Sequence, residues 1–138
     1  MEINFSKQDV EKILYDSFCN YGLDELCASS VCIDWDYSKN AFNYTSAKNR
    51  LVEQGEEDFC REDVYMEILK GGDSLIFTDY ENEEVIYLSL SSVLLNFNSL
   101  DNESKMEVAQ LLDEDNSCDA FDYYNALQYA LYSEVIFG

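Results

Sequence analysis

The 138-residue sequence contains no histidine and no proline, and it has only eight basic residues and five glycines. Without histidine, the Ser-His-Asp and Cys-His arrangements that activate a nucleophile are excluded. The lack of proline and the few glycines argue against long flexible linkers. Gly71-Gly72 is the only adjacent glycine pair and follows a helical pattern, so neither a phosphate-binding loop nor a cofactor is expected.

Negative charge is the feature present in excess, since 29 aspartate and glutamate residues against eight lysine and arginine residues give a formal net charge of -21. Residues 1–70 hold 15 acids and seven bases, whereas residues 71–138 hold 14 acids and Lys105 alone. A chain of this charge repels nucleic acid and anionic membranes and attracts cationic partners. We therefore expect a basic protein as the partner; solubility alone is the other interpretation of the charge.

The five cysteines include no C-x-x-C pair, and no histidine is present to complete a zinc site, so a structural metal is not expected. The first residues do not have the pattern of a secretory signal, and no apolar run approaches membrane-spanning length. These observations predict an intracellular, cytoplasmic protein whose thiols are reduced and mostly buried.

Length and composition predict one domain over residues 1–138. Hydrophobic residues make up 47% of the chain and aromatic residues 14%, which is enough to build one core at this length. The patterns below mix helices with a few strands. The predicted fold class is α+β, with a small antiparallel sheet that includes a hairpin over about residues 74–90, packed with several helices.

Apolar residues recur at helical spacing in several segments. Ser6 and Asp9 form a capping-box pattern before the first segment, which predicts a helix over residues 6–22 with Gly22 as its stop. Further helices are predicted over residues 45–54, 62–70, 91–97, 101–112 and 119–132. The apolar residues 135–137 are expected to dock on the core or on a partner.

Acidic residues also follow the predicted strands. Residues 31–37 alternate apolar and polar side chains, which predicts a strand with Asp34 and Asp36 on an acidic face. The turn of the hairpin is rich in acids, with Glu81, Glu83 and Glu84. Side chains two apart on a strand are roughly 7 Å apart, an interval similar to that of successive phosphates along a nucleic-acid strand. Such carboxylates are candidates to occupy lysine and arginine side chains that normally hold phosphates.

The segment Asp34–Ser38 has oxygen-bearing side chains at the positions of the first half of a calcium loop. The match fails further along, because Lys39 replaces the turn glycine and Thr45 replaces the bidentate glutamate. A cation contact at residues 113–115 fits the sequence less well than a solvated helix end. No metal site is predicted.

The last predicted helix is rich in tyrosine, with Tyr123, Tyr124, Tyr129 and Tyr132, and it begins near Asp119 and Asp122. Tyrosines beside acids suit contact with a basic partner, and core packing is the alternative role. The candidate partner-binding set is Asp34, Asp36, Glu81, Glu83, Glu84, Asp113, Glu114, Asp115, Asp119, Asp122 and Tyr123. No catalytic residue is assigned.

In size, acidity and content of tyrosine, the sequence resembles the small acidic proteins with which phages and mobile elements block restriction or CRISPR nucleases. The resemblance covers the whole chain but rests on composition, with no shared motif. It implies a non-enzymatic inhibitor that mimics nucleic acid and occupies the nucleic-acid-binding groove of a basic protein. It transfers no residue role.

Two other functions fit the sequence. An acidic adaptor or immunity-type protein would neutralise a basic toxin or partner without imitating nucleic acid. A carboxylate-based hydrolase would need two carboxylates with divergent pKa values in one cleft, and the sequence selects no such pair from its 29 acids.

Overall fold

The computed structural model describes residues 2–137, which form seven α-helices and one three-stranded antiparallel sheet. The strands lie in the order β1 (Val31–Ile33), β2 (Leu75–Asp79) and β3 (Glu84–Leu88). The helices are α1 (Lys7–Cys19), α2 (Gly22–Ala28), α3 (Ser38–Glu53), α4 (Arg61–Lys70), α5 (Leu90–Asn98), α6 (Asn102–Ala109) and α7 (Ala120–Tyr132). The predicted α+β class with a small antiparallel sheet is confirmed.

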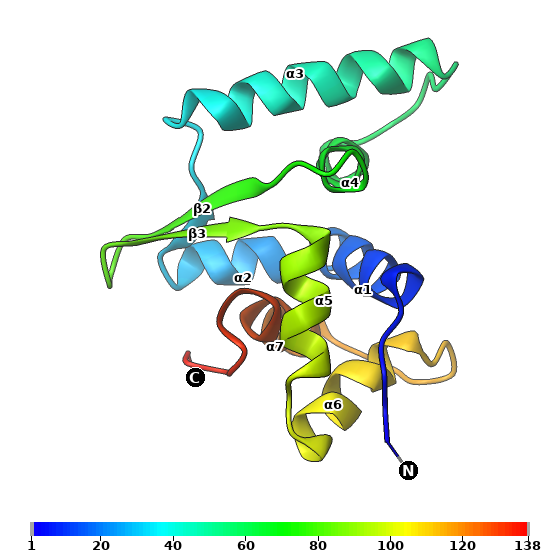
Figure 1. The fold of residues 1–138 in the computed structure, drawn as a ribbon, viewed down its shortest axis with the longest axis vertical. Coiled ribbons are helices and arrows are strands. Elements are labelled where there is room, and N and C mark those ends of the chain that lie inside the picture. The colour runs from blue at the N-terminus through cyan, green and yellow to red at the C-terminus, as the bar shows by residue number, and fades with distance from the viewer. Residues whose placement is uncertain (1, 138) are drawn as a thin grey trace.

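The sheet lies between α3 on one side and the group α1, α2, α5 and α7 on the other (Figure 1). Buried apolar side chains form one cluster, in which α7 packs against α1, α2 and α5. Asn40 attaches α3 to the sheet, because its amide nitrogen donates to the carbonyl oxygens of Asp34 and Ile76, at 2.7 and 2.8 Å. The Ile76 N–H returns a bond to the Asn40 side-chain oxygen at 2.9 Å.

The first helix begins as predicted but ends earlier. Ser6 and Asp9 form the capping box of α1. The helix stops at Cys19, and the chain turns at Tyr21, whose φ is 68°. Gly22 is not a stop: it begins α2 and is buried against α1, where an added Cβ would lie 2.5 Å from the Ser17 carbonyl oxygen. The glycine therefore permits a close approach of two helices.

The strand predicted over residues 31–37 is wrong beyond Ile33. The Asp34 carboxylate accepts a hydrogen bond from the Asp36 N–H at 3.0 Å, and the Tyr37 N–H donates to the Asp34 carbonyl oxygen at 3.3 Å. These local bonds turn the chain out of the sheet, as aspartate commonly does. Helix α3 then begins at Ser38, earlier than the helix predicted over residues 45–54.

The later elements agree more closely with the sequence patterns. The hairpin within residues 74–90 is confirmed as β2 and β3, and α4 ends before Gly71-Gly72 as predicted. The helix predicted over residues 101–112 is α6 followed by a 3-10 turn over Gln110–Leu112. The segment 135–137 docks, since Gln128 accepts hydrogen bonds from the Ile136 and Phe137 N–H groups at 2.9 and 2.8 Å.

The prediction of reduced, mostly buried thiols is wrong. Cys27 and Cys32 form a disulfide between the end of α2 and β1, and the free thiols of Cys19 and Cys60 are exposed. The short, tight connection between α2 and β1 brings Cys27 and Cys32 together. None of the helices in residues 2–137 combines the length and apolar character that a membrane span requires.

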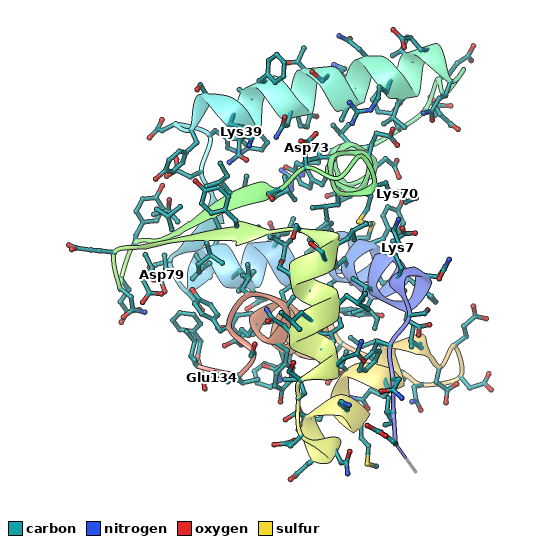
Figure 2. The ribbon with its side chains drawn as sticks, in the orientation of Figure 1. Lys7, Lys39, Lys70, Asp73, Asp79 and Glu134 are labelled. Carbon is teal, nitrogen blue, oxygen red and sulfur yellow. A yellow bond between two sulfur atoms is a disulfide. The ribbon has the colours of Figure 1, made fainter. Side chains whose placement is uncertain are left out.

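Asp79 joins the hairpin to the body of the molecule (Figure 2). It is fully buried, and its carboxylate accepts hydrogen bonds from the N–H groups of Glu81 and Asn82, the Asn82 side chain and the Tyr132 hydroxyl, at 2.9 to 3.1 Å. Burial alone would raise the pKa of Asp79, but the bonds from Asn82 and Tyr132 hold it below its ordinary value. The ionised Asp79 side chain therefore holds the turn between β2 and β3 and connects it to the end of α7.

Asp79→Ala should lower the free energy of unfolding by about 2–4 kcal/mol, because it leaves several donors without an acceptor in a buried place. Urea denaturation measures this loss. Glu81→Ala is the matched control: it removes an equal charge two residues further along, at an exposed position, and should change stability by less than about 0.5 kcal/mol.

The Asp79 contribution should also depend on pH with a defined sign. A carboxyl whose pKa is lowered by folding stabilises fully above its unfolded value of 3.8, and this stabilisation is lost as pH falls through the folded value. The gap between the wild type and Asp79→Ala should therefore narrow below about pH 4. A gap that stays constant down to acid unfolding would contradict the role assigned to the ionised form.

Candidate functional site

The strand pairing brings two predicted acidic segments together. Val31 pairs with Asp79 and Ile33 with Phe77, and the Asp34 N–H donates to the Ile76 carbonyl oxygen at 3.0 Å, so the chain that leaves β1 continues beside β2 of the hairpin. We define the hairpin surface as Asp36, Tyr37, Tyr80, Glu81, Glu83 and Glu84, which are all exposed. The hairpin extends from one side of the molecule in Figure 1.

Tyr80 lies at the centre of this grouping. Partial desolvation raises the pKa of its hydroxyl, and the neighbouring carboxylates of Asp34 and Asp36 raise it further. The hydroxyl therefore stays protonated and is able to donate to an acceptor. Tyr80 thus lies within reach of both acids that sequence reasoning had assigned to a strand.

Asp34 belongs to the scaffold of this surface. It is buried, and its carboxylate accepts a 2.6 Å hydrogen bond from the Thr78 hydroxyl in addition to the bond from the Asp36 N–H. The Thr78 bond, aided by that backbone bond, lowers the pKa of Asp34. Both carboxylate oxygens are occupied, so Asp36 is the acid of this pair that faces solvent.

Exposed aromatic and apolar side chains lie on the face of the hairpin that also carries buried Ile76. Val85 and Tyr87 pair with Thr78 and Ile76, and residues directly opposite on antiparallel strands project from the same face, as do residues two apart. Tyr80, Val85 and Tyr87 are 56%, 43% and 55% exposed. Sequence reasoning missed Val85 and Tyr87, although their alternation with Ile86 was the available signal.

Trp35 extends the aromatic area towards α3. It is 45% exposed and contacts Tyr44 and Tyr65, with ring centroids 5.6 and 6.1 Å away. These rings, together with Arg61 and α3, line an open hollow of about 370 Å³. Asp36 of the hairpin surface therefore follows Trp35 of this aromatic group directly in the chain.

The remaining predicted residues lie elsewhere. The loop before α7 is on the opposite side from the hairpin tip in Figure 1. Asp119 and Asp122 form the capping box of α7, and Asp113 accepts a 3.0 Å bond from the Asp115 N–H. Tyr123 is half-buried and lies close to both Lys12 and Asp16. This group, which also contains Glu114, is separate from the hairpin surface.

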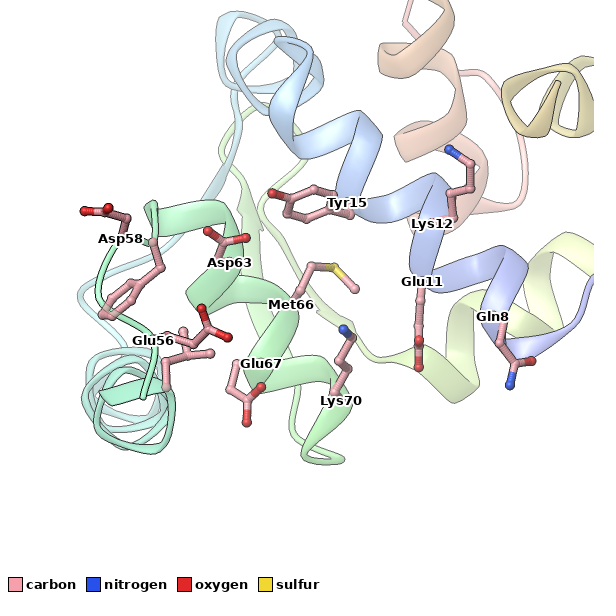
Figure 3. Close-up of a pocket in the computed structure, with 12 residues that line it drawn as sticks. Gln8, Glu11, Lys12, Tyr15, Glu56, Asp58, Asp63, Met66, Glu67 and Lys70 are labelled. Carbon is pink, nitrogen blue, oxygen red and sulfur yellow. The ribbon is translucent and has the colours of Figure 1, made fainter. Parts of the chain in front are cut away.

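A third acidic site was not predicted. A cleft of about 570 Å³ lies between α1, α4 and the loop that joins α3 to α4 (Figure 3). Carboxylates line it from all three segments, namely Glu11, Glu56, Asp58, Asp63 and Glu67. The run Glu56-Glu57-Asp58 was visible in the sequence, but the packing of α1 beside α4 that completes the cleft was not.

Hydrolytic chemistry in the cleft would need a carboxylic acid that stays protonated. Burial opposes ionisation of Asp63, yet hydrogen bonds from the Cys60 N–H and the Tyr15 hydroxyl lower the pKa of Asp63 below its ordinary value. A proton donor needs the opposite shift, so Asp63 is suited to remain a charged acceptor. Within residues 2–137, no group of three or more Cys, Asp or Glu side chains is arranged to hold a metal ion.

Comparison of the chain with protein-family models, curated proteins and solved structures finds no match. The assignment of function therefore depends on the physical properties of the surfaces described above.

Asp34 and Asp36 should behave differently when replaced. Asp34→Ala should lower the midpoint of thermal unfolding, because Thr78 and the turn after β1 lose their acceptor. Asp36→Ala removes the same charge at an exposed position and should leave the midpoint within about 2 °C. Circular dichroism melts of the two variants measure the difference; equal midpoints would show that the Asp34 bonds contribute nothing.

Proposed function

We propose that this protein is a non-enzymatic inhibitor that binds a basic, nucleic-acid-binding surface of a partner protein through its hairpin surface. The observation that supports this most directly is that none of the carboxylates of the hairpin surface forms an ion pair within residues 2–137. All three ion pairs within residues 2–137 lie in the first 70 residues. None of the 14 acids in residues 71–137 therefore forms an ion pair. The carboxylates of the hairpin surface are thus available to lysine and arginine side chains of another molecule.

Lys105 does not alter this balance. It is the sole cation of residues 71–138, but it is buried, and its ammonium group donates a 2.9 Å hydrogen bond to the Ile3 carbonyl oxygen. It is therefore engaged in holding the N-terminal segment. The hairpin carries its negative charge without internal compensation, as a surface that imitates phosphates requires.

The exposed rings beside the acids support binding over mere solubility. A surface that serves only to keep molecules apart has no need of exposed Trp35, Tyr80 and Tyr87 among its carboxylates. Tyrosine and tryptophan are enriched at protein interfaces, where a large apolar ring carries a polar tip. Carboxylates would engage basic side chains, and the rings would cover the apolar stems of those side chains.

The proposal includes an intracellular setting, because nucleic-acid-binding proteins are the partner class. The disulfide between Cys27 and Cys32 closes a loop of few residues, and such short loops constrain the unfolded chain least. Reduction of this bond inside a cell is therefore compatible with the fold.

Charge reversal of the hairpin should abolish partner binding. The partner is captured on the immobilised chain from a bacterial lysate at about 50 mM salt and released at about 500 mM salt, where surface charges are screened. The triple variant Glu81→Lys/Glu83→Lys/Glu84→Lys should reduce the captured amount at least tenfold, mainly by slowing association. Reversal of Asp113, Glu114 and Asp115 is the matched control, with the same charge change on the opposite side.

Competition separates a nucleic-acid mimic from an acidic adaptor. Duplex DNA or RNA added to the captured complex should displace a partner that is held through its nucleic-acid groove. Binding that resists both salt and nucleic acid, or that weakens equally in the two triple variants, would contradict the proposal.

A further inference from the structure

The cleft between α1 and α4 has properties that the hairpin surface lacks. It is hollow, and its floor contains the apolar side chains of Leu51, Phe59 and Met66. Its volume of about 570 Å³ lies within the range of small-molecule sites, roughly 300–1,000 Å³. A charged surface that only repels other molecules does not need a hollow with an apolar floor.

The carboxylates stand on both sides of that floor. Figure 3 shows Asp58, Glu56 and Asp63 on one side of Met66 and Glu11 on the other. An elongated ligand lying over Met66 would therefore meet negative charge at each end and apolar surface in its middle.

Several of these carboxylates are free to receive a ligand. Glu11, Glu56 and Asp58 make no side-chain hydrogen bond or ion pair with any other described residue. Glu67 differs, since it accepts from the Arg50 guanidinium at 3.3 Å. Asp63 is held by the Cys60 N–H at 2.9 Å.

The two lysines at the cleft have different roles. The Lys12 ammonium is engaged by the Asp16 carboxylate at 2.7 Å. Lys70 has no carboxylate of the described residues within ion-pair distance, and Figure 3 shows its nitrogen beside Met66. Lys70 is thus a built-in cation that competes for the carboxylates.

We propose that this cleft binds a linear aliphatic polyamine, with its ammonium groups on the carboxylates at the two sides and its methylene groups over Met66. A single metal ion fits less well, because it needs carboxylates that converge on one point, and these are spread along the cleft. A lysine on a folded partner would bring one ammonium group and leave the opposite side empty. The site is separate from the hairpin surface, so either proposal can fail alone.

Titration calorimetry with spermidine tests the site. The wild type should bind one equivalent, and butylamine, which has a methylene chain but one ammonium group, should bind at least tenfold more weakly. The double variant Glu11→Gln/Asp58→Asn should weaken spermidine binding about tenfold, as expected for two partly exposed ion pairs. Glu81→Gln/Glu83→Gln removes the same charge from the hairpin and should change the affinity less than about twofold.

Lys70 provides a test of the opposite sign. Lys70→Met keeps the aliphatic bulk but removes the competing ammonium group, so it should tighten spermidine binding about threefold. Lys39→Met removes an equal charge at the start of α3, outside the cleft, and should have little effect. Circular dichroism establishes that each variant is folded.

Several results would overturn the proposal. Equal weakening by the cleft and hairpin double variants would show general attraction of a polycation to an acidic molecule. Butylamine binding as tightly as spermidine would remove the need for carboxylates at both sides. A trilysine peptide that binds the cleft more tightly than spermidine would assign it to a protein segment instead. Unchanged or weaker binding by Lys70→Met would place the ligand outside the cleft.

Discussion

A buried carboxylate needs donors, and at Asp79 uncharged groups supply all of them. The N–H groups of the β2–β3 turn, the Asn82 side chain and the Tyr132 hydroxyl surround this one side chain, so a negative charge is kept in the interior without a cation. The hydrogen bond from Tyr132 joins residues that are far apart in the sequence, because it connects the hairpin to α7 in the core. The position of the exposed hairpin acids depends on this connection, since the turn that carries them is built on Asp79.

The same constraint applies along the whole chain, in which acids far outnumber bases. Asp34 is satisfied by Thr78 and a backbone N–H, and Asp63 by the Cys60 N–H and Tyr15. Asp101 and Asp119 accept from backbone N–H groups in the first turn of a helix, and Asp9, in the first turn of α1, accepts from the Ser6 N–H; negative charge is favoured at these helix starts. These acids are structural. The remaining acids include a set whose carboxylates make no hydrogen bond or ion pair within residues 2–137. This set includes the acids of the hairpin turn and Glu11, Glu56 and Asp58 of the cleft.

Local patterns in the sequence predicted the capped helices and the hairpin, because capping boxes and alternating residues act over a few positions. The strand at residues 31–37 was wrong because a hydrogen bond from the Asp36 N–H to Asp34 outweighed the alternation. Gly22 was misassigned because its role is a contact with Ser17 of the preceding helix, which local spacing does not reveal. Charge and local spacing identify acidic candidates but do not reveal burial, so they group buried Asp34 and the helix-capping Asp119 with exposed Glu81.

The hairpin surface and the α1–α4 cleft differ in which side chains surround the carboxylates. A net charge of -21 attracts cations to every side of the molecule, and this long-range attraction speeds encounter without selecting an orientation. Orientation requires short-range contacts that only one side provides. At the hairpin these are exposed rings, which suit a broad macromolecular surface. At the α1–α4 cleft they are an apolar floor inside a hollow, which suits a small elongated molecule. The same excess of carboxylates thus supports two different kinds of recognition, because the neighbouring apolar side chains determine the shape of the ligand that fits.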